Sequence, residues 1–141
     1  ESMLALNRSA AEAMLAHDVH GCTDVTGFGL LGHAREMALA SGVTIEIDTR
    51  AVRFLPGALE YARQGAVPGG LKNNREFVSP CVRSADSLPP EIETLLYDPQ
   101  TSGGLLISLP ESGAAALLAR LGGAYRLGRA VERGASPILL L

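Results

Sequence analysis

The sequence has few aromatic residues, only two cysteines and no excess of basic charge. Aromatic side chains make up 4% of the residues, tryptophan is absent, and 12 Lys and Arg stand against 15 Asp and Glu. Because platforms for base stacking and a basic surface are both scarce, a nucleic-acid partner is not expected. No apolar run approaches the roughly 20 residues of a membrane-spanning helix, and no segment resembles a signal peptide. We therefore expect no membrane partner.

The cysteines, Cys22 and Cys81, belong to no CxxC pair and make no disulfide framework, which favours a reducing, cytoplasmic location. Free cysteine is among the most buried residue types, so we expect Cys22 to be buried on a strand. No histidine or lysine lies near Cys81 in the sequence, so a catalytic thiol is not expected there. The spacing of His17, His20 and His33 does not match a zinc site, and we expect His33 to be a surface or helix-packing residue.

Apolar residues, in contrast, are abundant. They make up 47% of the 141 residues, against 19% charged residues, which is enough for a well-packed core and argues against disorder. We expect a single domain over residues 1–141. The chain opens with a helical pattern at Glu1 instead of an initiator methionine, so we expect it to be a piece of a longer protein.

Helical and strand-like patterns alternate along the chain. Apolar residues at helical spacing, with Gly or Pro at the boundaries, predict helices over 2–16, 29–40, 56–64, 88–96 and 111–121. Extended segments are predicted at 19–25, 43–48, 105–109, 124–131 and 136–141. The Gly, Pro and Asn residues of 65–80 predict a long loop. Interleaved elements of this kind predict an α/β or α+β sandwich with a mixed sheet.

Three of these patterns also predict which side chains face the core. The helix over 2–16 is expected to bury one stripe, made of Met3, Leu6, Ala10, Ala13 and Met14. The strand over 43–48 alternates strictly, with apolar Val43, Ile45 and Ile47 on one face. The helix over 111–121 is expected to turn Ala115, Leu118 and Leu121 inward.

Two glycine-bearing segments share a design that could serve anion binding. "CTDVTGFGLLGH" (22–33) and "YDPQTSGGLLIS" (97–108) each combine one Asp, hydroxyl side chains and closely spaced glycines. Successive backbone N–H groups in such turns form concave anion sites, and a helix N-terminus adds partial positive charge. Glycine matters there because a Cβ would block the approach of a phosphate or of another backbone.

Two interpretations of Asp24 remain open on the residues alone. It could cap the turn before a helix that begins at Phe28 or Gly29, or it could be a hard oxygen ligand for Mg²⁺ beside a phosphate. Asp98, ahead of a proline, is expected to form an Asx turn. The basic and amide residues of "LKNNR" (71–75) could meet an anion, although a solvated loop is the simpler interpretation.

The same two segments, in this order, resemble the signature segments of the C-terminal domain of selenophosphate synthetase (selenide, water dikinase). "MLALNRSAAEAM", "GGLKNNREF" and "AYRLGRAVERGASPILLL" are similar to that family too, so the resemblance covers essentially the whole chain. It implies a three-layer α/β/α domain of the kind found in aminoimidazole ribonucleotide synthetase. It also implies a reaction in which ATP, selenide and water give selenophosphate, AMP and phosphate.

The resemblance further implies how the site is assembled. Asp24 would bind Mg²⁺, the cofactor used with ATP. The partners would be the protein's own N-terminal domain, ATP and selenide, in a homodimer. The residues near phosphate or nucleotide would be Thr23, Thr26, Gly27, Phe28, Gly29, Gln100, Thr101, Ser102, Gly103 and Gly104.

Nothing in the chain matches the N-terminal half of the family, which carries a reactive Cys or selenocysteine, a catalytic lysine and most of the metal-binding aspartates. We therefore expect no catalytic residue in this piece and no activity from it alone, because one carboxylate holds Mg²⁺ weakly. Two alternatives stay open. One is the equivalent domain of another ATP-using relative, such as a purine-synthesis synthetase or thiamine monophosphate kinase. The other is a non-catalytic packing or dimerisation module.

Overall fold

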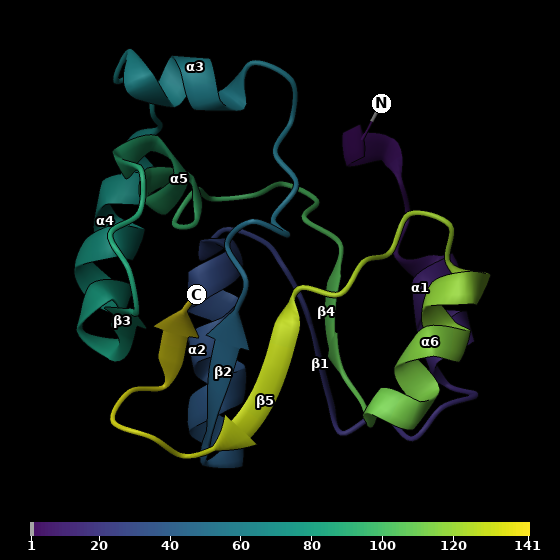
Figure 1. Cartoon of the computed structure of the whole chain (residues 1–141). Helices are drawn as coiled ribbons and strands as arrows, with labels where there is room; N and C mark the ends of the chain where they lie inside the picture. The colour runs from purple at the N-terminus through teal and green to yellow at the C-terminus, as the bar shows by residue number, and fades with distance from the viewer. Residues whose placement is uncertain (1) are drawn as a thin grey trace.

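The computed structural model describes residues 2–141, and its helices and strands interleave along the chain (Figure 1). The helices are α1 (Arg8–Met14), α2 (Gly29–Ser41), α3 (Ala58–Arg63), α4 (Gly69–Val78), α5 (Pro90–Leu95) and α6 (Glu111–Arg120), with 3-10 turns η1 (Ser2–Leu4) and η2 (Ser79–Cys81). The strands are β1 (Gly21–Asp24), β2 (Val43–Ile47), β3 (Val82–Ser84), β4 (Leu105–Ser108), β5 (Gly128–Glu132) and β6 (Ile138–Leu140). Across residues 2–141, no helix is long and apolar enough to span a membrane.

The strands form two sheets. The larger has the order β3-β6-β2-β5, with β6 parallel to β3 and to β2, and β5 antiparallel to β2. The smaller is an antiparallel pair of β1 and β4, in which Asp24 lies opposite Leu105. Figure 1 shows this pair between the larger sheet and the neighbouring helices α1 and α6. The predicted class, mixed α and β with a mixed sheet, is confirmed.

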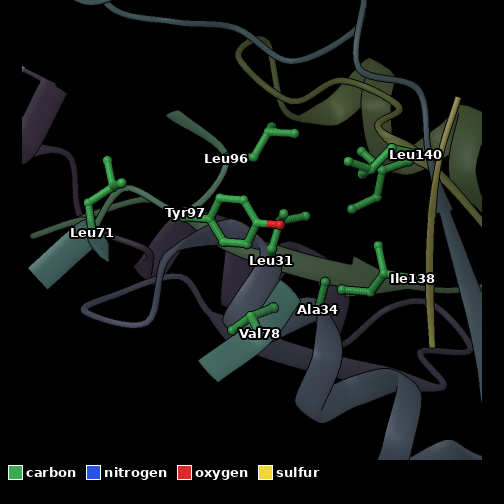
Figure 2. Close-up of a cluster of buried hydrophobic side chains, with 9 residues drawn as sticks. Leu31, Ala34, Leu71, Val78, Leu96, Tyr97, Ile138 and Leu140 are labelled. Atoms are coloured by element: carbon green, nitrogen blue, oxygen red, sulfur yellow. The ribbon is translucent and has the colours of Figure 1, made fainter. Parts of the chain in front are cut away.

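One apolar cluster joins α2 and α4 to the larger sheet. Figure 2 shows the ring of Tyr97, which is 2% exposed, in the middle of this cluster. Its buried members are Leu31, Ala34, Ile47, Leu71, Val78, Leu96, Tyr97, Ile138 and Leu140. Because Tyr97 is the first residue of the second glycine-bearing segment, this core anchors the start of that segment.

Helix α2 and strand β2 agree closely with the sequence patterns. The helix ends at Gly42, whose φ of 63° is the left-handed conformation that favours glycine at a helix C-terminus. Strand β2 follows at once, and Ile47 is fully buried as the alternation predicts. Thr44, expected on the polar face, is also buried, and it donates a 2.6 Å hydrogen bond to the Ser136 carbonyl and accepts one from the Gly134 N–H.

The predictions for the outer helices were partly wrong. The helix expected over 2–16 is broken into η1 and the shorter α1, and of its predicted stripe only Ala13 is buried, while Met3 and Leu6 are 64% and 80% exposed. Helix α6 lies where it was expected, but it buries Leu117 and leaves Ala115 exposed. Both helices pack mainly against each other at the edge of the fold, so neither needs a full apolar stripe.

Most of the loop expected over 65–80 is instead helix α4 followed by η2, and only 65–68 lie outside helices and strands. Pro68 has an extended conformation at the start of the helix, and two glycines occupy its first turn. Leu71, Asn74 and Val78 then recur at helical spacing and are all buried. Burial of this face outweighs the low helix propensity of glycine and asparagine, which had favoured a loop.

Candidate functional site

Asp24 is the last residue of β1, where the chain leaves the β1–β4 pair. Side chains alternate along the strand, so Cys22 and Asp24 are exposed while Gly21 and Thr23 are half-buried. Cys22 is therefore not the buried residue that the sequence predicted. Partial desolvation of its thiol raises the pKa of Cys22, and the nearby Asp24 charge raises it further. The thiol thus stays protonated beside an exposed carboxylate.

Asp24 is not a helix cap. The N-cap position of α2 is Phe28, and no side chain makes a capping hydrogen bond there. Among residues 2–141, no partner hydrogen-bonds or forms an ion pair with the Asp24 carboxylate. Of the two interpretations left open by the sequence, capping is wrong, and the carboxylate is available to a ligand from outside the chain.

Backbone hydrogen bonds hold the two glycine-bearing segments side by side. The Val25 N–H donates to the Gly104 carbonyl at 2.9 Å, and the Gly103 N–H donates to the Val25 carbonyl at 2.9 Å. The Gln100 N–H donates to the Thr26 carbonyl at 3.0 Å. The structure thus brings together the two predicted loops, and these three N–H groups have partners within the chain.

Two glycines are required because the segments approach so closely. Gly29 has a φ of 71°, and a Cβ there would lie 2.8 Å from the Asp98 carbonyl oxygen. A Cβ on Gly103 would lie 2.8 Å from both the carbonyl oxygen and the Cγ1 of Val25. The glycines at these positions therefore make room for another backbone, which is one of the two roles that the sequence suggested.

His33 organises the first segment, a role that its sequence position did not reveal. Its Nε2 accepts hydrogen bonds from the Thr26 N–H at 3.0 Å and from the Thr26 hydroxyl at 3.1 Å. A backbone N–H can only donate, so Nε2 carries a lone pair and the proton of the neutral ring lies on Nδ1. That Nδ1 is 3.5 Å from the hydroxyl of Thr23. The imidazole thus ties both threonines that flank Asp24 and Val25 to helix α2.

Asn74 of α4 was also missed. Its side chain is buried, with 8% exposure, and its Nδ2 donates to the Gly27 carbonyl at 2.9 Å and to the Tyr97 carbonyl at 3.0 Å. These carbonyls belong to different segments. The signal in the sequence was the spacing of Leu71, Asn74 and Val78, which places the amide on the buried face once 69–78 is recognised as a helix.

Asp98 does not form the expected Asx turn, because the Gln100 N–H donates to Thr26 instead. The Asp98 carboxylate accepts a 2.5 Å hydrogen bond from the Gln100 side chain. Partial burial raises the pKa of the Asp98 carboxyl, and the Gln100 hydrogen bond acts in the opposite direction. Burial therefore disfavours the charged form of this side chain.

This raised pKa predicts a pH dependence of stability. Between the unfolded and the folded pKa of Asp98 the folded chain binds more protons, so its contribution to stability falls as pH rises through that window. Replacing Asp98 with Asn should therefore raise the melting temperature relative to the wild type more at pH 7 than at pH 3, by about one to a few degrees. Thermal unfolding followed by circular dichroism at both pH values measures the difference.

Asp48 supplies a control of opposite sign. The side-chain and backbone hydrogen bonds of Arg50 lower the pKa of Asp48, so its stabilising contribution is present at neutral pH and is lost as pH falls. Asp48→Asn should accordingly cost more at pH 7 than at pH 3. The same pH trend for both variants would contradict the assignment for Asp98.

The remaining predicted site residues lie around this junction. Thr101 is exposed, Ser102 is half-buried, and Gly27 and Gly104 have open space where a Cβ would be. Phe28 is 60% exposed and lines a hollow together with Gly32, Glu36 and Phe77, which is 57% exposed. The guanidinium of Arg35 lies 4.5 Å from the centre of the Phe77 ring. An apolar surface therefore begins four residues after Asp24.

The residues present fit one part of a metal site only. Over residues 2–141, no group of three or more His, Cys, Asp or Glu side chains is placed to hold a metal ion. Asp24 is an exposed carboxylate of the kind that Mg²⁺ prefers, but a Mg²⁺ site needs more oxygen ligands than one. Any such site would be completed by groups from outside this chain.

The mixed α and β fold belongs to a known class of domain. The family described as "AIR synthase related protein, C-terminal domain" matches residues 1–139. The chain belongs to this family.

The curated relatives point to a narrower group. A selenide, water dikinase from Clostridium botulinum (strain Eklund 17B / Type B) is 42% identical over 98% of this chain and 41% of its own length. That of Caldanaerobacter subterraneus is 45% identical over 94% of this chain and 40% of its own length. That of Pelobacter propionicus is 47% identical over 85% of this chain and 34% of its own length. The chain thus spans about two-fifths or less of these relatives and matches their C-terminal part.

Solved structures share the fold. The hydrogenase maturation protein HypE in complex with ATP has a TM-score of 0.60 and 25% identity, covering 96% of this chain and 36% of its own. A second HypE structure has a TM-score of 0.59 over 95% of this chain. The likeness extends over almost the whole domain.

Proposed function

We propose that this chain is the C-terminal part of a selenide, water dikinase, which converts ATP, selenide and water to selenophosphate, AMP and phosphate. The observation that carries the proposal is the exposed carboxylate of Asp24 at the junction of the two loops, which has no partner within residues 2–141. The chain is 42–47% identical to proteins of that name. An acidic oxygen ligand at such a junction suits a reaction whose substrate is a magnesium-bound nucleotide.

Within this proposal Asp24 would hold Mg²⁺ through its carboxylate, and the ion would supply neutralisation of charge on phosphate oxygens. The chain's own residues hold that carboxylate in place. His33 ties the threonines beside it to α2, and Val25 joins its strand to the second loop. Gly103 and Gly104 of the second loop are hydrogen-bonded to Val25, the residue after Asp24. Nucleotide phosphates would approach at this junction.

The remaining groups would come from a preceding domain, because the chain lacks a complete metal-binding set over residues 2–141. The exposed rings of Phe28 and Phe77, which line one hollow, offer an apolar surface against which that domain could pack. We propose that the complete protein is a homodimer that uses ATP and selenide as substrates. Phosphoryl transfer depends on many groups acting together, so each part would be inactive alone.

The isolated chain should be catalytically inactive. The 141 residues should form no AMP from ATP and selenide above the uncatalysed background, because they hold one carboxylate of a site that needs several. AMP is measured by chromatography after anaerobic incubation with Mg²⁺, and the complete protein serves as the positive control. Selenide-dependent turnover by the isolated chain would contradict the proposed division of the site.

A further inference from the structure

Besides the backbone hydrogen bonds between the two loops, one side-chain amide, that of Asn74, contacts both of them from the core of the domain. Asn74 is on the buried face of α4, between Leu71 and Val78, which are 2% and 0% exposed. Both hydrogen bonds of its Nδ2 go to backbone carbonyls, one to Gly27 and one to Tyr97. An amide NH₂ has two protons, so its donors are fully used.

These two carbonyls belong to the two segments that meet at Asp24. Gly27 lies three residues after Asp24, and Tyr97 immediately precedes Asp98 in the second segment. The packing of Leu71 and Val78 in the core fixes the height and rotation of α4, and therefore the position of the amide. Asn74 is thus anchored by the core and reaches both loops at once.

We propose that Asn74 is a positioning residue that fixes the two loops relative to each other and so sets the position of the Asp24 carboxylate. The link to metal binding rests on the proposed function, whereas the link to loop geometry does not. Both partners are carbonyl oxygens, that of Tyr97 at a buried contact and that of Gly27 at a partly buried one, so an acceptor in place of the NH₂ group would remove a donor from both. The close approach of Gly29 to the Asp98 carbonyl at the same junction leaves little room for the loops to readjust.

The chain offers a matched pair of variants. Asn74→Asp keeps the size of the side chain but replaces the NH₂ donor with an acceptor that faces two carbonyls. Asn73→Asp makes the same chemical change on an exposed residue of the same helix. Asn74→Leu removes the donors without adding charge, and it replaces Asn74→Asp in both measurements if the Asp variant does not fold.

The first measurement is amide hydrogen exchange of the isolated chain by NMR, read at Gln100 and Gly103, whose N–H groups donate to the first loop. We expect exchange at both amides to be about tenfold or more faster in Asn74→Asp, and unchanged in Asn73→Asp, after correction for global stability from urea unfolding. Equal exchange in the two variants, or a change that global stability fully explains, would overturn the proposal.

The second measurement is the Mg²⁺ dependence of AMP formation by the complete protein. The Mg²⁺ concentration for half-maximal activity should rise about tenfold in Asn74→Asp, with most of kcat recovered at saturating Mg²⁺, as for outer residues that orient a metal ligand. A loss of stability alone would lower the amount of active protein and leave that concentration unchanged.

The Mg²⁺ dependence of Asp24→Asn, measured in the same assay, distinguishes the proposed metal-binding role of Asp24 from the positioning role of Asn74. If its Mg²⁺ dependence is unchanged, the metal-binding role of Asp24 fails, and the exchange of Gln100 and Gly103 decides the role of Asn74 in loop geometry. If Asp24→Asn is impaired and Asn74→Asp has the Mg²⁺ dependence of Asn73→Asp, the positioning role is overturned while the proposed function stands.

Discussion

Asp24→Asn in the complete protein is expected to lower selenide-dependent AMP formation about a hundredfold or more at low Mg²⁺. The substitution keeps the size of the side chain but removes the negative charge that a hard cation prefers. The exposed carboxylate has no protein partner within residues 2–141, so its loss should leave stability nearly unchanged. The measurement is initial rate against Mg²⁺ concentration, with thermal unfolding as the check on folding.

Asp18 provides a matched control for the loss of a carboxylate. It is an exposed aspartate that lies before the same strand and is 3.3 Å from the ring of His20. Asp18→Asn should have the rate and the Mg²⁺ dependence of the wild type. If Asp24→Asn also retains both, Asp24 binds no catalytic metal, and the loops have only a packing role.

Gly29→Ala should be the most destabilising single substitution at the loop junction. A left-handed φ costs a residue with a Cβ about 1–2 kcal/mol, and forcing an atom into a packed place costs about 1–3 kcal/mol more. The added Cβ would meet the Asp98 carbonyl oxygen at 2.8 Å and the Tyr97 carbonyl at 3.0 Å, so both terms apply. We expect the free energy of unfolding to fall by about 3 kcal/mol in urea titrations of the isolated chain.

Two other glycines separate these costs. Gly104 has a φ of 83° but open space around the position of its Cβ, so Gly104→Ala should cost about 1 kcal/mol. Gly27 has neither a positive φ nor a neighbour within 4 Å of that position, so Gly27→Ala should be nearly neutral. If Gly29→Ala cost no more than Gly104→Ala, the loops would not be in the close contact described here.

Sequence patterns predicted the helices and strands in which apolar residues recur with the period of that element. Alternation in 43–48 identified β2, and the apolar spacing that ends at Gly42 identified α2. The pairing of an Asp with glycines in two distant segments singled out the two loops that the structure brings together. These features could be predicted because each depends on residues that are close together in the chain.

The missed features depend on contacts between distant residues. Helix α4 was predicted as a loop because Gly, Pro and Asn disfavour helices, and burial against the core reverses that preference. His33 had no recognisable signal, and the spacing that marks Asn74 has a meaning only once 69–78 is recognised as a helix. The partners of both side chains include backbone groups of loops whose positions depend on the whole fold. Capping by Asp24 was wrong because the helix begins after Phe28 without a side-chain cap, and the Asp24 carboxylate has no hydrogen-bond partner within residues 2–141.

The products formed by the complete protein test most directly whether this chain is part of a selenide, water dikinase. ³¹P NMR of an anaerobic mixture with ATP, Mg²⁺ and selenide should show selenophosphate, AMP and orthophosphate in equal amounts. The Asp24→Asn variant should form all three much more slowly. ATP cleavage that yields ADP, or that proceeds without forming a phosphorus–selenium bond, would contradict the assignment of this chain to a selenide, water dikinase.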